Sequence, residues 1–222
     1  MAGTHKPGTV RPYLLTFRLL LDYIGTDPNP CRDPRVKLPK RVREEPRPPS
    51  AEHFLAIVAA VHDPIRRLLL VTVEQGALRL GEAISLTWGD VDRAGLRLRL
   101  PRSATKRDQA RWVYLPEWLI EAIEQTCPFD DRTPERRVFQ GVTEATMYQT
   151  MIRACQTAGV PHYHPHDLRH RRITIWHQSG VPARELAERA GHARASMSLD
   201  VYSHVMPPDE VDSGTLQPLL RA

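Results

Sequence analysis

The chain has 222 residues, of which 41% are hydrophobic, which is enough for one substantial core and excludes a disordered tail. Its 31 lysines and arginines outnumber its 26 acidic residues, and the resulting pI near 9.4 favours a polyanionic partner. The three cysteines stand far apart with no CxxC pair, so neither a disulfide framework nor a cysteine-rich zinc site is indicated. No apolar run approaches membrane-spanning length and no leader pattern follows Met1, so we expect a cytoplasmic protein without a membrane partner.

The first part of the chain predicts a single helix and a linker. Residues 9–24 carry apolar side chains at helical spacing, and such a helix needs a partner surface to be stable. Residues 25–50 contain seven prolines and seven basic residues against four acidic ones, which predicts an extended linker. Its positive charge could follow a phosphate backbone, or the segment could be a solvated spacer.

From residue 50 onwards the pattern is mostly helical. Ser50 and Asp63 are expected N-caps of two helices, and Pro64 takes the favoured first position of the second, which Gly76 ends. A short helix is expected over residues 79–86. Later helices are predicted over residues 116–126, 143–159, 167–180 and 182–191, with a last short turn over 196–205, and glycines 159, 180 and 191 mark three of the ends.

The middle of this region predicts a small sheet. Alternation of apolar and polar residues begins after "TWGDVD" (87–92), continues around an "RAG" turn and returns in "RWVYLP" (111–116). This pattern predicts three antiparallel strands, with Lys106 near the tip of the polar hairpin "RSATKRDQA" (102–110). The expected fold class is therefore α+β, mostly α-helical, with a small three-stranded antiparallel sheet.

The stretch "HYHPHDLRH" (162–170) holds four of the ten histidines, and its first part suggests two roles. On an alternating strand His162 and His164 would point the same way, as in the His-hydrophobic-His motif of metal-dependent nicking enzymes that also use a tyrosine. No nearby acidic cluster completes such a site, and the DxD of "WGDVD" is typical of a strand-end turn. Surface or capping roles are favoured for both, and for His53 and His62.

The second part, "PHDLRH", suggests a phosphate site. His166 and Arg169 stand three apart across a helix start, so both side chains can face one spot near helical N–H groups. Comparable chemistry is offered elsewhere in the chain by Arg79 at the start of a short helix, Lys106, His192 and Tyr202. Arginine suits a phosphodiester, because its guanidinium fork pairs two oxygens and remains charged.

Together these segments resemble the catalytic domain of the tyrosine recombinases, the phage integrase family, over residues 50–205. The resemblance rests on "LRLGEAISLTWGDVD", "TKRDQARWVYLP", "HDLRH" and "GHARASMSLDVYSHV", in the family's order. It implies four parts: the last helix of an incomplete core-binding domain at 1–25, a basic proline-rich linker at 26–49, the catalytic domain at 50–206 and a C-terminal tail at 207–222.

The resemblance also implies the reaction: site-specific DNA recombination or integration by strand cleavage and rejoining through a covalent 3′-phosphotyrosine. In this scheme Arg79 and Arg169 clamp the phosphate and Tyr202 attacks phosphorus. The remaining expected roles are proton acceptor for His166, phosphate or tyrosine contact for His192, proton donor to the 5′-oxygen for Lys106, and support of the site for Glu82 and His170, unless these two are merely surface residues. No metal or other cofactor is implied, and the partners are double-stranded DNA and further copies of the chain, as a tetramer.

Two departures from the family pattern bear on this scheme. Ala77 stands where the family usually has glycine, two residues before the first arginine, and the N-terminal part is short, as in a fragment or a shortened member. The tail, with Leu216, Leu219 and Leu220, could dock on a neighbouring protomer or cap its own domain. The alternatives are a metal-dependent nicking enzyme using "HYH" and a non-catalytic DNA-binding fragment.

Overall fold

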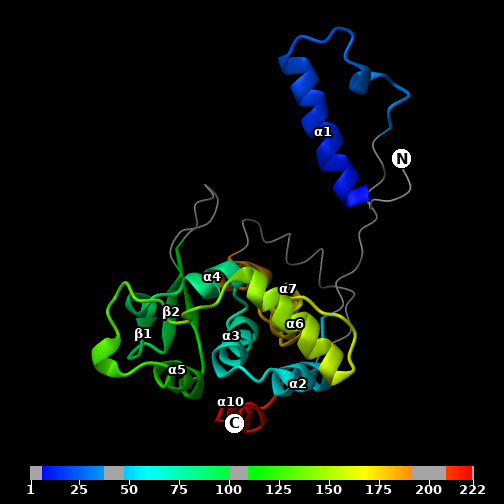
Figure 1. Cartoon of the computed structure of the whole chain (residues 1–222). Coiled ribbons are helices and arrows are strands. Elements are labelled where there is room, and N and C mark those ends of the chain that lie inside the picture. The colour runs from blue at the N-terminus through cyan, green and yellow to red at the C-terminus, as the bar shows by residue number, and fades with distance from the viewer. Residues whose placement is uncertain (1–6, 38–47, 101–109, 192–208, 222) are drawn as a thin grey trace. The chain divides into compact units, whose positions relative to one another are not determined.

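The computed structural model describes residues 7–37, 48–100, 110–191 and 209–221 (Figure 1). They fall into two compact units, Met1–Glu45 and Pro46–Ala222. Within these described ranges, no helix is both long and apolar enough to cross a membrane.

The first unit is built on α1 (Pro7–Tyr23), which forms where a helix was expected. The prediction that the next residues run extended is wrong for residues 25–37, because they turn back onto α1 through a 3-10 turn, η1 (Pro30–Arg32). Arg18 of α1 donates to the carbonyl of Cys31 at 2.6 Å, and this contact holds the returning segment.

Asp22 of α1 makes the second attachment. Arg32 binds its two carboxylate oxygens at 2.9 and 2.7 Å, and Asn29 donates to it at 2.7 Å. The hydrogen bonds from Arg32 and Asn29 lower the pKa of Asp22 to about 2. The returning segment covers only part of α1, and apolar side chains such as Phe17 and Leu19 stay exposed.

The second unit is mostly helical, as expected. Its described helices are α2 (Ala51–Ala60), α3 (Pro64–Gln75), α4 (Leu80–Ser85), α5 (Glu117–Glu124), α6 (Glu144–Ala158), α7 (Pro165–Gln178), α8 (Ala183–Ala190) and α10 (Ser213–Arg221). In the core α2 packs on α6 and α3 packs on α7 (Figure 1). Residues 67–74 of α3 are all buried, so α3 forms the centre of this unit.

The ends of these helices follow the predicted signals. Ser50 accepts from the amide of His53 at 3.1 Å, and Asp63 accepts from the amide of Arg66 at 3.0 Å. Gly191 ends α8 in the left-handed conformation, with φ +65°. Only a residue without Cβ adopts that conformation easily, so the glycine determines where α8 stops.

The predicted three-stranded antiparallel sheet is present. It consists of β1 (Val91–Asp92), β2 (Arg97–Leu100) and β3 (Arg111–Tyr114) in the order β1-β2-β3. Leu98 pairs with Val113, and both are buried against the helices. Since side chains alternate along a strand, Arg111 lies on the same inward side as Val113.

A buried ion cluster joins α3 to α7. Glu74 of α3 binds Arg171 at 2.7 Å and Arg172 at 3.0 Å, and the side chains of Glu74 and Arg171 are fully buried. Arg172 also pairs with Glu210 at 2.7 Å, and Arg171 donates to the carbonyl of Asp209. The cluster therefore holds α7, and with it the "HDLRH" segment, against the centre of the core.

The described part of the tail packs on its own domain. Leu216 of α10 is fully buried, and α10 contacts α2, α3 and α5. Arg67 of α3 donates to the carbonyl of Val61 at the end of α2 and to the carbonyl of Leu219 in α10. These two bonds join α10 to the connection between α2 and α3. The described tail residues thus lie on their own domain in this single chain, and docking of the tail on a neighbouring protomer stays a prediction.

Candidate active site

Arg79 occupies the turn between α3 and α4. Its backbone N–H donates to Glu82 Oε2 at 2.8 Å and its Nη1 donates to Glu82 Oε1 at 2.8 Å, so the first carboxylate of α4 fixes both the helix start and the guanidinium. Ala77, two residues earlier, has φ +47°. This left-handed conformation costs a non-glycine residue roughly 1–2 kcal/mol, a cost that glycine at this position would avoid.

Arg169 lies on α7 and is 2% exposed. Its Nη1 donates to the carbonyl of Ala77, and its Nη2 donates to the carbonyl of Ala190 at 2.5 Å. A single guanidinium thus connects the turn that carries Arg79 with the end of α8. The hydrogen bond from buried Arg169 holds the turn in its strained conformation at Ala77.

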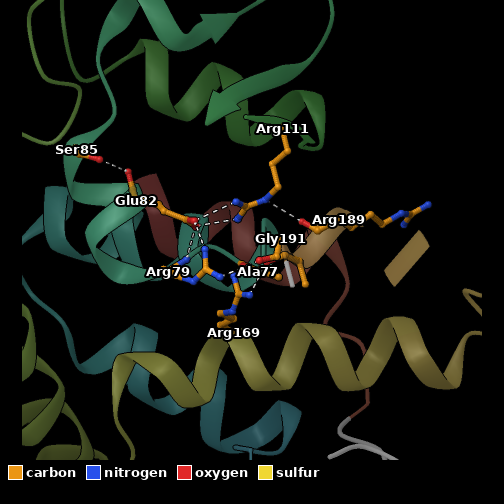
Figure 2. Close-up of polar contacts among 9 residues, drawn as sticks. Ala77, Arg79, Glu82, Ser85, Arg111, Arg169, Arg189 and Gly191 are labelled. Carbon is orange, nitrogen blue, oxygen red and sulfur yellow. Dashed lines mark hydrogen bonds and ion pairs between the residues drawn. The ribbon is translucent and has the colours of Figure 1, made fainter. Parts of the chain in front are cut away.

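The C-terminal end of α8 is the point where the site converges (Figure 2). Arg111 Nε donates to the carbonyl of Arg189 at 3.2 Å, Arg169 to that of Ala190, and Arg79 Nη2 to that of Gly191 at 2.8 Å. The last carbonyls of a helix lack partners within the helix and carry partial negative charge, so cations are favoured there. Three arginines from three other elements hold this end in place.

Glu82 and Arg111 complete the cluster. Arg111 Nη1 and Nη2 donate to the two oxygens of Glu82 at 3.0 and 2.8 Å, and their side chains are only 11% and 13% exposed. Burial raises the pKa of Glu82, but its bonds with Arg111 and Arg79 outweigh that effect and leave the pKa below its usual value. Glu82 therefore carries a full negative charge between two arginines. This position is compatible with the expectation that Glu82 supports the site.

Sequence reasoning did not identify Arg111. The signal was the phase of the strand, since Val113 and Leu115 are buried and an alternating strand then turns Arg111 inward as well. An inward-facing arginine needs acceptors for its guanidinium, either a carboxylate or backbone carbonyls. Which acid serves could not be read from the sequence, because Glu82 is separated from Arg111 by a whole hairpin.

His166 stands in the first turn of α7, one turn before Arg169. Its ring meets that of His170 edge to face, with 4.4 Å between centroids. Desolvation of the imidazole and the positive charges of Arg169 and Arg79 lower the pKa of His166, against the opposite effect of Asp167. The ring is therefore neutral at pH 7 and able to accept a proton.

The two "HYH" histidines contact each other and the start of α7. The rings of His162 and His164 lie 4.6 Å apart, and the His164 amide donates to Asp167 Oδ2 at 2.7 Å at the start of α7. His53 shares a hydrogen bond of 2.8 Å with the hydroxyl of Tyr163. Among the described residues, no group of three or more His, Cys, Asp or Glu side chains is placed to hold a metal ion. Nothing in this part of the chain favours the metal hypothesis over surface and capping roles.

The structure thus brings Arg79 and Arg169 to one helix end and places His166 a turn away. The other three expected site residues, Lys106, His192 and Tyr202, lie outside the described residues. His192 is the residue directly after Gly191, whose carbonyl Arg79 binds.

Solved structures of similar fold include recombinases and integrases. The chain is similar to the Tn1549 transposon integrase in complex with a circular intermediate DNA, with a TM-score of 0.71 and 17% identity over 91% of this chain and 77% of that one. It is also similar to XerA recombinase, with a TM-score of 0.59 and 17% identity over 98% of this chain and 76% of that one. At these identities the likeness shows the fold.

Sequence comparison then identifies the family. Residues 50–207 match the model of the phage integrase family. The chain is 30% identical over 184 residues to tyrosine recombinase XerC of Corynebacterium efficiens, covering 77% of this chain and 58% of that protein. It is 21% identical over 205 residues to the ICEBs1 integrase of Bacillus subtilis, covering 81% of this chain and 55% of that protein. The chain belongs to the phage integrase family, and it spans a little over half the length of these curated relatives.

Proposed function

We propose that this chain cleaves and rejoins DNA strands in site-specific recombination or integration, through a covalent 3′-phosphotyrosine formed by Tyr202. The observation that carries the proposal is the meeting of Arg79 and Arg169 at the end of α8, directly before His192. Family membership supports the reaction class.

Arg79 and Arg169 form the phosphate clamp in this mechanism. Attack on a phosphodiester builds negative charge on the non-bridging oxygens, and preorganised cations stabilise that charge without having to move. The bonds of both guanidinium groups to backbone carbonyls hold them in place before DNA arrives. The side chain of Arg79 is 36% exposed, which leaves a surface for the phosphate to meet.

His166 is the proposed proton acceptor for the tyrosine. A tyrosine hydroxyl has a pKa of about 10, so it attacks phosphorus only with a base or a strong positive field beside it. The lowered pKa of His166 supports the base role, because a neutral imidazole can take the proton. Desolvation of the ring, together with the same two arginines proposed to bind phosphate, favours its neutral form.

The other roles fall on residues outside the described part. Tyr202 is the nucleophile, His192 contacts the phosphate or places the tyrosine, and Lys106 gives a proton to the leaving 5′-oxygen. The phosphotyrosine keeps the bond energy, so a 5′-hydroxyl reverses the step and reseals the strand. The reaction needs no nucleotide cofactor.

We further propose double-stranded DNA as the substrate and a tetramer of this chain on it. A DNA substrate is supported by similarity to XerH site-specific recombinase bound to its difH substrate, with a TM-score of 0.65 and 21% identity over 91% of this chain and 63% of that one. Residues 50–206 would form the catalytic domain and 1–25 the last helix of a core-binding domain, with 26–49 between them, of which 26–37 fold back onto α1. Light scattering of the chain on a DNA site tests the assembly, and a monomer at saturating DNA would contradict it.

Covalent trapping tests the chemistry. The chain is mixed with a pool of nicked duplexes in EDTA, denatured and run on a gel beside Tyr202→Phe. Tyr114→Phe is the matched control, because it removes the hydroxyl of an exposed tyrosine in the same unit. We expect a DNA adduct in wild type and in the control and none in Tyr202→Phe.

Two other results would contradict the proposal. An adduct that requires added metal would return the site to "HYH", and tight DNA binding with no adduct at all would favour a non-catalytic module. The proton-donor role has its own test: a substrate with a 5′-sulfur leaving group, which needs no proton, should rescue Lys106→Ala. Without that rescue, Lys106 is not the donor.

A further inference from the structure

We propose that Arg111 is a positioning residue for Arg79, acting through Glu82 as the counter-charge that keeps Arg79 available to a phosphate. The inference rests on the proposed phosphate-binding role of Arg79. It assigns a function to a residue that lies on β3 of the sheet, whereas Arg169 and His166 lie on α7.

The first argument is the coordination of the Glu82 carboxylate. Its Oε1 accepts from Arg79 Nη1 at 2.8 Å and from Arg111 Nη1 at 3.0 Å. Its Oε2 accepts from the Arg79 backbone N–H and from Arg111 Nη2, both at 2.8 Å. Two carboxylate oxygens offer about four acceptor positions, so each arginine takes half of them. Neither arginine can move without leaving part of a buried carboxylate unpaired.

The second argument is the balance of charge. With Glu82 alone as neighbour, Arg79 would form a neutral pair and attract a phosphate weakly. Arg111 adds a second positive charge, and the cluster of these three residues then carries a net positive charge. Arg111 and Glu82 are 11% and 13% exposed, so solvent screens their charges little, whereas Arg79 is 36% exposed and can meet a phosphate from outside.

The third argument is the end of α8. Arg111 also donates from Nε to the carbonyl of Arg189 at 3.2 Å. A Cβ built on Gly191 would lie 2.5 Å from Arg111 Nη1, so the glycine leaves the space that the guanidinium fills (Figure 2). Through this packing Arg111 fixes the strand, the carboxylate and the residue before His192 relative to one another.

These contacts require an arginine. Three nitrogens of one planar group bind three acceptors on two elements, and the single ammonium of lysine cannot reproduce that fork. Arg111→Lys therefore keeps the charge and loses the geometry, while Arg111→Gln loses both. Arg97→Gln is the matched control, since Arg97 lies on the same sheet and pairs with Asp92 at 2.7 Å, outside the cluster.

The experiment measures adduct formation on a nicked duplex in a single turnover at saturating DNA, with the DNA Kd measured separately. We expect Arg111→Gln to slow adduct formation about 10²-fold, since small displacements of a catalytic group cost that much, with Kd changed only a few-fold. Arg111→Lys should recover part of the rate, and Arg97→Gln should match wild type.

A second change separates charge compensation from simple support. In Arg111→Gln, Glu82 neutralises Arg79 and weakens its attraction for the phosphate, so adding Glu82→Gln should raise the rate above that of Arg111→Gln alone. If Arg111 only supported the fold, the double variant would be slower than either single variant. That result, or a rate for Arg111→Gln or Arg111→Lys equal to wild type, overturns the inference.

A readout without DNA distinguishes this inference from the proposed function. NMR titration of the Glu82 carboxyl should give a higher pKa in Arg111→Lys and Arg111→Gln than in wild type, and no change in Arg97→Gln. An unchanged pKa overturns the coupling even in an active protein. If the pKa rises but wild type forms no Tyr202-dependent adduct, the proposed function fails while the coupling stands.

Discussion

Replacing the buried carboxylate Glu74 by glutamine should destabilise the second unit strongly. Glu74 and Arg171 have no exposed side-chain surface, and 2.7 Å separates their charged groups. Removing one partner of a buried pair leaves the other charge uncompensated in a place that water does not reach, which typically costs about 3–5 kcal/mol.

The contacts that remain after Glu74→Gln place the expected loss of unfolding free energy within this range. After Glu74→Gln, Arg172 keeps its bond to Glu210, which is 63% exposed, so only Arg171 loses its charged partner. Arg171 retains the carbonyl of Asp209 and the ring of Phe54, whose centroid lies 5.1 Å from its guanidinium carbon. We therefore expect a loss near the lower end, about 3 kcal/mol, which corresponds to roughly 6–12 °C in Tm for a domain of this size.

Urea unfolding at pH 7, followed by tryptophan fluorescence, measures the loss. All four tryptophans lie in the second unit, so the first unit does not contribute to the signal. Glu185→Gln is the matched control, because its ion pair with Arg189 leaves both side chains about half exposed and should be worth less than about 1 kcal/mol.

A second variant tests the reason for the loss. Glu74→Gln combined with Arg171→Met removes both charges and should recover part of the stability, since no unpaired charge then stays buried at this place. The Nε atoms of Arg171 and Arg172 are buried with no hydrogen-bond partner among the described residues, which adds to the cost of keeping these charges inside. A loss below about 1 kcal/mol for Glu74→Gln, or a double variant weaker than both single variants, would refute the charge argument.

Three smaller perturbations test local geometry. The pKa of the His166 imidazole, measured by NMR, should lie below its usual value of 6.5 because of desolvation and the nearby arginines. The rate of adduct formation should therefore fall to half its maximum at a pH below 6.5. A pKa at or above 6.5 would contradict the desolvation and arginine effects. Gly191→Ala should lose more unfolding free energy than Gly159→Ala, because both glycines have φ near +65° but only at Gly191 would the new Cβ meet Arg111; equal losses would mean that the guanidinium moves aside easily. Asp63→Ala should lose about 1 kcal/mol in urea unfolding through the lost cap of α3, and an unchanged stability would show that water caps that helix as well.

Much of the fold was predictable because its signals are local. Ser50 and Asp63 cap helices with their own side chains, and glycine at 191 permits the left-handed residue that ends α8. Alternation around the sheet likewise depends on neighbours in sequence. Prediction was wrong at residues 25–37, since the prolines and charges there suggested an extended segment, while Arg18 and Asp22 bind it to α1.

The arginines show where local signals end. The run "RHRR" (169–172) looks like a solvated helix face, yet Arg171 and Arg172 are buried on Glu74. Nothing near them in sequence announces a carboxylate on another helix. Arg111 is a further example, because its acidic partner Glu82 lies on α4, which precedes all three strands in the sequence.

By itself, the sequence determined the strands, the family and most of the helices, since capping residues, apolar periodicity and the four motifs are all written in short stretches of chain; α10 was not predicted. The catalytic roles expected of all six site residues stay predictions; they are Arg79, Lys106, His166, Arg169, His192 and Tyr202. Only the tertiary structure decided that Arg79, Arg111 and Arg169 meet on consecutive carbonyls at the end of α8. These bonds join residues distant in sequence, and such a meeting depends on how α3, α7, α8 and the sheet pack rather than on any local preference.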